Sequence, residues 1–210
     1  MDAIVLEGVS YRQGRFALSN IDLRIRSGSY AALLGPTGCG KTTLLELIAG
    51  LRNHDAGSIS LRGLAASRLT PAERSLGYVP QDAAVFGHLT VRANLGFGFA
   101  IRKQSNPVRI AELAGALDLS SILDRRAAEL SGGEAQRVAL GRALVTAPDI
   151  VLMDEPFSAL DDAAKAKAIA LVRSHREKAT FLHVTHHRDD VVDLADRIFE
   201  FRNGRVEELA

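Results

Sequence analysis

Alternating apolar and polar residues predict two long strands at the start of the chain. The apolar positions within residues 3–11 and 21–26 are Ile4, Leu6, Val9, Tyr11, Ile21, Leu23 and Ile25. This period of two is typical of strands with one buried face. Gly14 and Arg15 indicate a turn between them. The pattern breaks at residues 55–57 and returns over residues 58–61, so we predict an antiparallel sheet.

Apolar runs predict a second sheet that is covered on both faces. They occupy residues 30–34 and 150–153, and strand character appears again at residues 181–185; such runs are typical of buried parallel strands. Residues 161–178 are rich in Ala, Lys and Arg and predict a crossover helix. Near the end of the chain, residues 198–201 and 205–207 flank the pair Asn203-Gly204, and the three together are a strong hairpin signal.

The character of the chain changes at about residue 87. Residues 90–100, 108–118 and 132–146 have helical apolar patterns, a polar loop at 102–107 joins the first two, and no strand pattern interrupts them. We therefore predict one α/β domain, residues 1–210. Residues 1–86 and 147–210 would form a mostly parallel core and an N-terminal antiparallel β part, and residues 87–146 an inserted α-helical subdomain.

Composition narrows the range of partners. The 210 residues contain 26 Lys and Arg against 25 Asp and Glu, so no global field favours nucleic acid or an anionic membrane surface. Cys39 is the single cysteine, which excludes an internal disulfide and suits a reducing compartment. The chain start lacks the pattern of a signal peptide, and no apolar run approaches the roughly 20 residues of a membrane span. We expect a cytosolic chain whose membrane role, if any, requires another chain.

Residues 35–43 carry the clearest chemical signal. They fit the pattern G-x-x-x-x-G-K-[ST] between an apolar strand and an apolar helical pattern. Glycines let the backbone N–H groups turn inward, and the positive end of the following helix faces the same place, so the loop is suited to a polyphosphate. Lys41 would reach the β- and γ-phosphates and Thr42 would bind Mg²⁺. The expected nucleotide-binding residues are Gly35, Pro36, Thr37, Gly38, Cys39, Gly40, Lys41, Thr42 and Thr43.

Two further motifs extend this site. Asp154 and Glu155 follow a buried strand, at the edge where open α/β sheets bind ligands. Asp154 would hold Mg²⁺ directly or through water, and Glu155 could polarise the attacking water as a general base. Residues 131–134 open a helix whose N–H groups could also receive an anion. A monomer has no obvious use for two phosphate-binding helix ends.

These motifs together resemble the ATP-binding cassette family, the nucleotide-binding subunits of ABC transporters. Residues 35–43 resemble the Walker A loop, 130–134 the signature sequence and 150–155 the Walker B strand. The resemblance covers essentially the whole chain and implies a P-loop NTPase fold with a RecA-like core. It also implies a head-to-tail dimer in which the signature sequence of one subunit contacts the ATP held by Lys41 of the other. The residues expected to act across this dimer are Ser131, Gly132, Gly133, Glu134 and Asp161.

Smaller family motifs add further expectations. Gln81 resembles the Q-loop glutamine that contacts Mg²⁺ and the attacking water and links the core to the helical insert. Asp161, in 158–161, resembles the D-loop aspartate at the dimer interface; otherwise it is a helix N-cap. His186 resembles the switch histidine that contacts the γ-phosphate. Tyr11 matches the aromatic residue that stacks on adenine, or it is a strand residue buried between sheets.

Some positions depart from the family pattern. Glu134 and Ala135 stand where glutamines are frequent, and His187 stands where an aspartate usually follows the switch histidine. The chain ends soon after the predicted hairpin, so we expect no C-terminal regulatory domain. A metal site formed by His183, His186 and His187 is disfavoured, because alternation along a strand sends 183 and 186 to different faces.

The expected function is that of an ATP-hydrolysing transporter subunit, peripheral on the cytoplasmic face of the inner (plasma) membrane. Its expected partners are Mg-ATP, a second copy, integral membrane permease subunits and, as a further candidate, a solute-binding protein, but no nucleic acid. Residues 86–95 resemble importer cassettes more than exporter cassettes. The alternatives are a soluble cassette that acts on ribosomes or DNA and a membrane-associated cassette that transmits force without moving a solute. The sequence does not identify the solute.

Overall fold

The first layer of the fold is the antiparallel sheet predicted from the N-terminal alternation. The computed structural model describes residues 1–202 and 204–209, and in it four strands pair in the order β2-β1-β4-β5. Their bounds are β1 Asp2–Gln13, β2 Phe16–Arg26, β4 Ala56–Leu61 and β5 Leu64–Ala65. All their pairings are antiparallel. The predicted sheet is confirmed, and its first two strands are longer than expected.

One expectation about this sheet was wrong. Ala56 and Gly57 were expected to break the chain, yet they begin β4. Gly57 has φ of 86°, and a Cβ added there would lie 2.4 Å from the backbone oxygen of Gly8. The glycine therefore permits a close approach of β4 to β1 rather than a turn, because any side chain would collide with the neighbouring strand.

The second sheet has six strands in the order β10-β9-β3-β8-β7-β6. The pairings among β9, β3, β8, β7 and β6 are parallel, and β10 pairs antiparallel with β9. This confirms the mostly parallel core and the terminal hairpin, although Asn203 itself lies outside the described residues. The bounds are β3 Tyr30–Leu34, β6 Gly77–Val79, β7 Ile150–Asp154, β8 Thr180–Thr185, β9 Arg197–Arg202 and β10 Arg205–Leu209.

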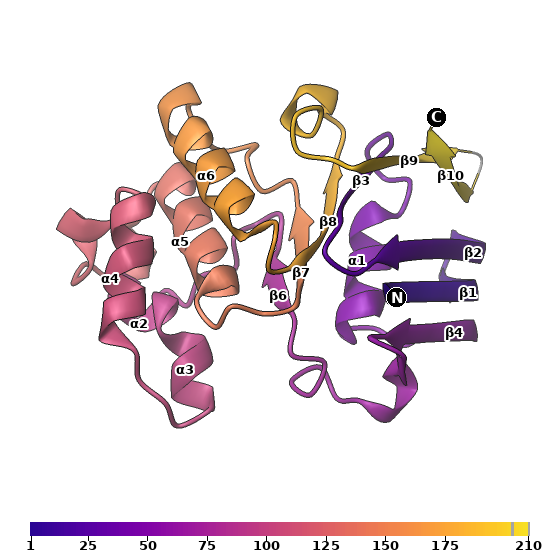
Figure 1. The fold of residues 1–210 in the computed structure, drawn as a ribbon, viewed down its shortest axis with the longest axis horizontal. Helices are drawn as coiled ribbons and strands as arrows, with labels where there is room; N and C mark the ends of the chain where they lie inside the picture. Colours follow the sequence, from indigo (N-terminus) through magenta and orange to yellow (C-terminus); the bar gives the residue numbers. More distant parts are fainter. Residues whose placement is uncertain (203, 210) are drawn as a thin grey trace.

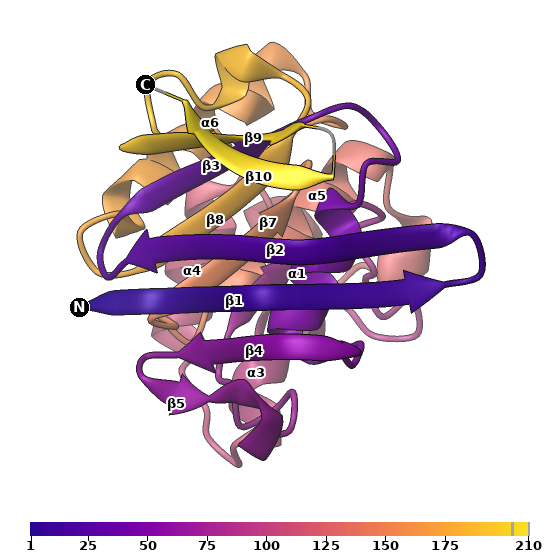
Figure 2. The same ribbon diagram turned by 90° about the vertical axis from the view of Figure 1, so that its right-hand side faces the viewer.

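Burial on both faces explains the apolar runs in the central strands. Along β7, Ile150 and Leu152 belong to one hydrophobic cluster, whereas Val151 and Met153 belong to another. The first cluster contains the antiparallel sheet and helix α1 (Lys41–Ala49), and the second contains the remaining helices. In Figure 1, α1 lies between the two sheets, and α5 and α6 cover the opposite face of the central sheet. Figure 2 shows β1, β2 and β4 in front of α1.

The helical part departs from prediction in one place. Residues 90–100 were expected to form one helix, but two short helices meet at Gly96. A Cβ on Gly96 would lie 2.9 Å from the Ile110 side chain, so the break accompanies close packing of α4. The helices are α2 Val91–Leu95, α3 Phe97–Ile101, α4 Pro107–Ala116, α5 Gly132–Leu144 and α6 Asp162–His175, with 3₁₀ turns η1 Ala66–Arg68, η2 Ser120–Ile122, η3 Ala127–Glu129 and η4 Arg188–Asp190. Within the described ranges, none of these helices has the length and apolar character needed to cross a bilayer.

Candidate functional site

The loop between β3 and α1 has the geometry that its glycines predict. Gly38 and Gly40 have φ of 81° and 111°, in the region that only glycine adopts at low cost. A Cβ on Gly40 would lie 2.9 Å from Cζ of Phe16, so a side chain there would also collide with the first residue of β2. The Lys41 ammonium donates to the backbone oxygens of Gly35 at 2.7 Å and Pro36 at 3.0 Å, which curls the loop around the start of α1.

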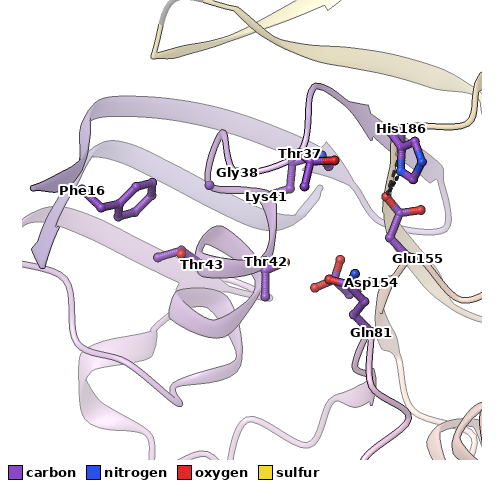
Figure 3. Close-up of a pocket in the computed structure, with 11 residues that line it drawn as sticks. Phe16, Thr37, Gly38, Lys41, Thr42, Thr43, Gln81, Asp154, Glu155 and His186 are labelled. Carbon is purple, nitrogen blue, oxygen red and sulfur yellow. Dashed lines mark hydrogen bonds and ion pairs between the residues drawn. The ribbon is translucent and has the colours of Figure 1, made fainter.

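This loop forms one wall of a pocket of about 260 Å³ at the carboxyl edge of the central sheet. Gln81 enters it after β6, Asp154 from the last position of β7 and Glu155 directly after it, and His186 after β8 (Figure 3). The fold thus gathers side chains from distant parts of the sequence, as the motif order predicts. The lining residues are Phe16, Thr37, Gly38, Gly40, Lys41, Thr42, Thr43, Gln81, Asp154, Glu155 and His186. Gly35, Pro36 and Cys39 support the loop without lining the pocket, and Cys39 packs against the first hydrophobic cluster.

The Asp154 carboxylate is suited to a divalent cation. Its side chain is buried, and its Oδ2 atom has no hydrogen-bond partner among the described residues. Burial raises the pKa of Asp154, and the Thr42 hydroxyl opposes that shift. A buried oxygen without a partner is costly unless something binds it. Carboxylate, hydroxyl and amide oxygens, supplied here by Asp154, Thr42 and Gln81, are the ligands that Mg²⁺ accepts in proteins.

Glu155 is held in a single orientation by the end of β8. Its Oε1 accepts from the backbone N–H of His186 at 3.0 Å and lies 2.6 Å from His186 Nδ1, and its Oε2 accepts from the Thr185 hydroxyl at 2.8 Å. The Glu155 backbone has φ of 47°, an uncommon conformation for a residue with a side chain. Sequence reasoning missed Thr185, whose only signal was its position directly before His186.

The aromatic ring in the pocket is Phe16, not Tyr11. Tyr11 does not line the pocket; its hydroxyl donates to Gln13 at 3.2 Å and accepts from Arg52 at 2.9 Å. In Figure 3, Phe16 lies at one end of the pocket and Glu155 and His186 at the other, with Lys41 and Thr42 between them. The expectation that placed Tyr11 at the nucleotide finds no support in this geometry. The residue that sequence reasoning missed is the first residue of β2.

Comparison with known proteins decides the family. Residues 18–158 match the family model described as "ABC transporter". The chain belongs to the ABC transporter family. It is 43% identical over 212 residues to the sulfate/thiosulfate import ATP-binding protein CysA of Thermosynechococcus vestitus, a match that covers 98% of this chain and 63% of CysA. It is 46% identical over 202 residues to an Fe(3+) ions import ATP-binding protein of Rhodococcus jostii, covering 93% of this chain and 58% of that protein.

Solved ABC structures have the same fold. An ATP-binding cassette, solved as a dimer in a post-hydrolysis state with ADP and Pi, superposes with a TM-score of 0.88 at 26% identity, and the match covers 99% of each chain. A bacterial Atm1-family ABC exporter with ATP bound gives 0.88 at 27% identity over 98% of this chain and 38% of the exporter. The predicted P-loop NTPase fold is confirmed. The chain spans about 60% of the length of the curated relatives quoted above.

The residues that resemble the signature sequence lie outside the pocket, at the N-terminus of α5. Ser131 caps this helix by accepting from the Glu134 N–H at 3.3 Å, and the Glu134 carboxylate accepts from the Ser131 N–H at 2.7 Å. Arg125 donates to the same carboxylate at 2.8 Å. Ser131 and Gly132 are exposed. None of the residues 131–134 lines the pocket in this chain, so the sequence motif is an accessible helix end.

The remaining motif residues have structural partners as well. Asp161 is the N-cap of α6, accepting from the Ala164 N–H at 2.8 Å, as the simpler interpretation of this residue predicted. His183 is fully buried, with Nδ1 2.8 Å from the Tyr30 hydroxyl, while His186 faces Glu155. Among the described residues, no group of three or more His, Cys, Asp or Glu side chains is placed to bind a metal.

Proposed function

We propose that this chain is the ATP-binding and ATP-hydrolysing unit of an ABC importer. The observation that carries the proposal is the pocket itself, because one cavity combines a phosphate loop with Gln81, Asp154, Glu155 and His186. The names of the relatives, which are import ATP-binding proteins, support the importer assignment. We propose that the base of ATP lies at Phe16 and its γ-phosphate near Glu155 and His186; the position of these residues at opposite ends of the pocket supports this orientation.

Each phosphate-side residue has a proposed role. Lys41 and the N–H groups of the loop bind the β- and γ-phosphates, with Gly35, Pro36, Thr37, Gly38, Cys39, Gly40 and Thr43 shaping the loop. Thr42, Asp154 and Gln81 hold Mg²⁺, which, when bound, neutralises charge on the phosphates. Catalysis of this kind depends on positioning and electrostatics more than on covalent chemistry.

Glu155 is the proposed general base. Its carboxylate is fixed by Thr185 and His186, so it can accept a proton from water without first losing rotational freedom. The exposed ring of His186, hydrogen bonded to that carboxylate, is the proposed contact to the γ-phosphate. His187 follows it directly, and the two rings are in contact, with centroids 3.8 Å apart and planes inclined at 41°.

A second copy of the chain completes the proposed site. The residues proposed to act across the dimer are exposed or half-buried and do not line the pocket of their own chain; they are Ser131, Gly132, Gly133, Glu134 and Asp161. The dimeric cassette of the same fold supports their placement against the ATP of a partner. We also propose that residues 87–146 act as a helical subdomain that carries this surface relative to the core of residues 1–86 and 147–210.

Membrane permease subunits are the proposed partners for transport. A groove of about 250 Å³ between the core and the helical part is lined by Phe86, Phe97 and Ile101 among other residues, and it offers an apolar surface beside the Gln81 loop. Attachment there would make the chain peripheral on the cytoplasmic face of the inner membrane. A solute-binding protein is a further candidate partner. The non-transport alternatives, a soluble cassette or a force-transmitting one, have no observation in their favour.

Phosphate release by the purified chain tests the proposal. Glu155→Gln keeps the shape of the side chain and removes the base, so we expect turnover to fall by at least about 100-fold while ATP binding persists. Glu177→Gln, an exposed carboxylate elsewhere on the molecule, is the matched control and should retain the wild-type rate. Normal turnover in Glu155→Gln would overturn the assignment of the base, and no Mg-ATP hydrolysis by the wild-type chain would overturn the proposed activity.

A further inference from the structure

The loop that follows Gln81 is held in an unfavourable conformation. Ala83 and Ala84 have φ of 60° and 42°, in the left-handed region where a Cβ approaches the following carbonyl oxygen. Neither residue has the polar side chain that eases this conformation in Asn or Asp. The surrounding structure must therefore stabilise the loop, because an isolated Ala-Ala segment would leave this region.

Arg142, in the last turn of α5, binds both carbonyls of this pair, whose N–H groups donate to Pro80 and Asp82 within the loop. Its Nη1 donates to the backbone oxygen of Ala84 at 2.8 Å and its Nη2 to that of Ala83 at 3.0 Å. The guanidinium carbon also lies 5.0 Å from the centroid of the Phe86 ring. Both strained residues are thus bonded to one planar cation, and the residue at the end of the loop packs on it.

The Arg142 guanidinium makes its hydrogen bonds to this loop and not to an acidic side chain. No carboxylate in residues 1–202 or 204–209 lies within 4.0 Å of the Arg142 nitrogens. Burial lowers the pKa of Arg142, and the Asp82 carboxylate opposes that shift. Hydrogen bonds from a charged donor are stronger than those between neutral groups. Arg142 is therefore a firm anchor for the two carbonyls.

The two ends of α5 connect different parts of the proposed machinery. Ser131 caps the helix at the exposed signature end, and Arg142 lies at the other end of the same 13-residue helix. Gln81, which lines the nucleotide pocket, is two residues before Ala83. A helix transmits displacement along its axis because its backbone hydrogen bonds resist deformation.

We propose that Arg142 is a positioning residue for ATP hydrolysis, which holds the strained loop so that Gln81 lies in the pocket and couples that position to α5. The inference rests on the proposed ATPase function. Loss of the guanidinium lets Ala83 and Ala84 relax toward negative φ, which withdraws the Gln81 amide from the catalytic end of the pocket. Binding of ATP, which depends on the loop of residues 35–43, is retained.

The test compares Arg142→Ala with Arg142→Ala/Ala84→Gly. We expect Arg142→Ala to lower kcat about 5- to 30-fold, which is the rate factor that corresponds to the free-energy cost of holding one residue with a Cβ in the left-handed conformation. The KM for ATP should change less than about twofold. Ala84 is exposed, and glycine adopts positive φ without strain, so the second substitution should recover at least about threefold of kcat. Arg142→Lys, which retains the charge but loses the planar fork, should have an intermediate rate.

Controls separate positioning from general damage. Arg92→Ala removes an exposed arginine of the helical part and should leave kcat unchanged, and thermal unfolding should show that each variant is folded. If Arg142→Ala does not fold, the same comparison is made with Arg142→Lys and Arg142→Lys/Ala84→Gly. Unchanged kcat on loss of Arg142, or a loss that Ala84→Gly does not relieve, overturns the inference. A wild-type chain without ATPase activity would instead overturn the proposed function.

Discussion

Replacing Phe16 tests which aromatic residue of the chain holds the base of ATP. Phe16 lines the pocket and Tyr11 does not, so Phe16→Ala should weaken ATP binding and Tyr11→Ala should not. Stacking of a base on an aromatic ring contributes roughly 1–3 kcal/mol by alanine substitution, which corresponds to a Kd for ATP raised about 5- to 150-fold. The half-buried ring also packs against the first hydrophobic cluster, so its truncation lowers stability as well.

Two controls isolate the stacking contribution. Phe16→Leu retains apolar bulk against the cluster and loses the π-face, so its Kd should resemble that of Phe16→Ala while its stability remains closer to wild type. Inorganic tripolyphosphate has phosphates but no base, so its affinity should be the same in all variants. Titration calorimetry with Mg²⁺ and a non-hydrolysable ATP analogue measures the first affinity, and competition measures the second. Equal weakening of both ligands, or loss of ATP affinity only in Tyr11→Ala, would refute the placement of the base.

Three further predictions concern stability. Arg74 is buried and donates to the backbone oxygens of Leu47, Ile48 and Ala66, so Arg74→Ala should cost about 2–5 kcal/mol in urea unfolding, with Arg74→Lys in between. Burial lowers the pKa of His183 from 6.5 to about 3; the unfolded chain then binds the extra proton, so stability falls as pH drops below 6.5. Between pH 7 and 5 the wild type should lose about 2 kcal/mol more than His183→Leu, with His88→Gln, an exposed histidine, behaving as wild type. Ser131→Ala should cost about 1 kcal/mol through loss of the α5 cap, and a stability equal to wild type would contradict that role.

The parts of the fold that the sequence predicts are those decided by local pattern. Alternation identified β1 and β2, and apolar runs identified β3 and β7, because burial on both faces favours apolar residues at every position. In β8 the same burial accommodates His183 and Thr185, which hydrogen bond to Tyr30 and Glu155. The break expected at Gly57 and the single helix expected across Gly96 were wrong for one reason. Each glycine makes room for a residue distant in sequence, Gly8 or Ile110. That contact cannot be predicted from the residues next to the glycine in the sequence.

The candidate site divides in the same way. Lys41, Asp154 and Glu155 follow strands whose ends meet at one edge of the sheet, so topology alone brings them together. Phe16 and Arg142 could not be recognised, because nothing adjacent in sequence identifies what they touch. Phe16 reaches the pocket because the β1–β2 hairpin extends over Gly40. Arg142 contacts the loop after Gln81 because the C-terminal turn of α5 packs beside that loop. These contacts arise from the angle at which elements pack.

The internal bonds of Lys41 change what its substitution measures. The ammonium donates to two carbonyls of its own loop, and each such bond to a charged donor stabilises a fold by roughly 1.5–3 kcal/mol. Contact with a phosphate must exchange some of these bonds for new ones, so the affinity that Lys41 adds is a difference between two sets of partners. Removing the side chain also removes these two bonds within the loop. The loop then becomes more mobile, and ligand binding must order it at a cost in conformational entropy. The affinity lost in a Lys41→Met variant would therefore combine a missing charge with a missing scaffold, and would exceed the contribution of the phosphate contact alone.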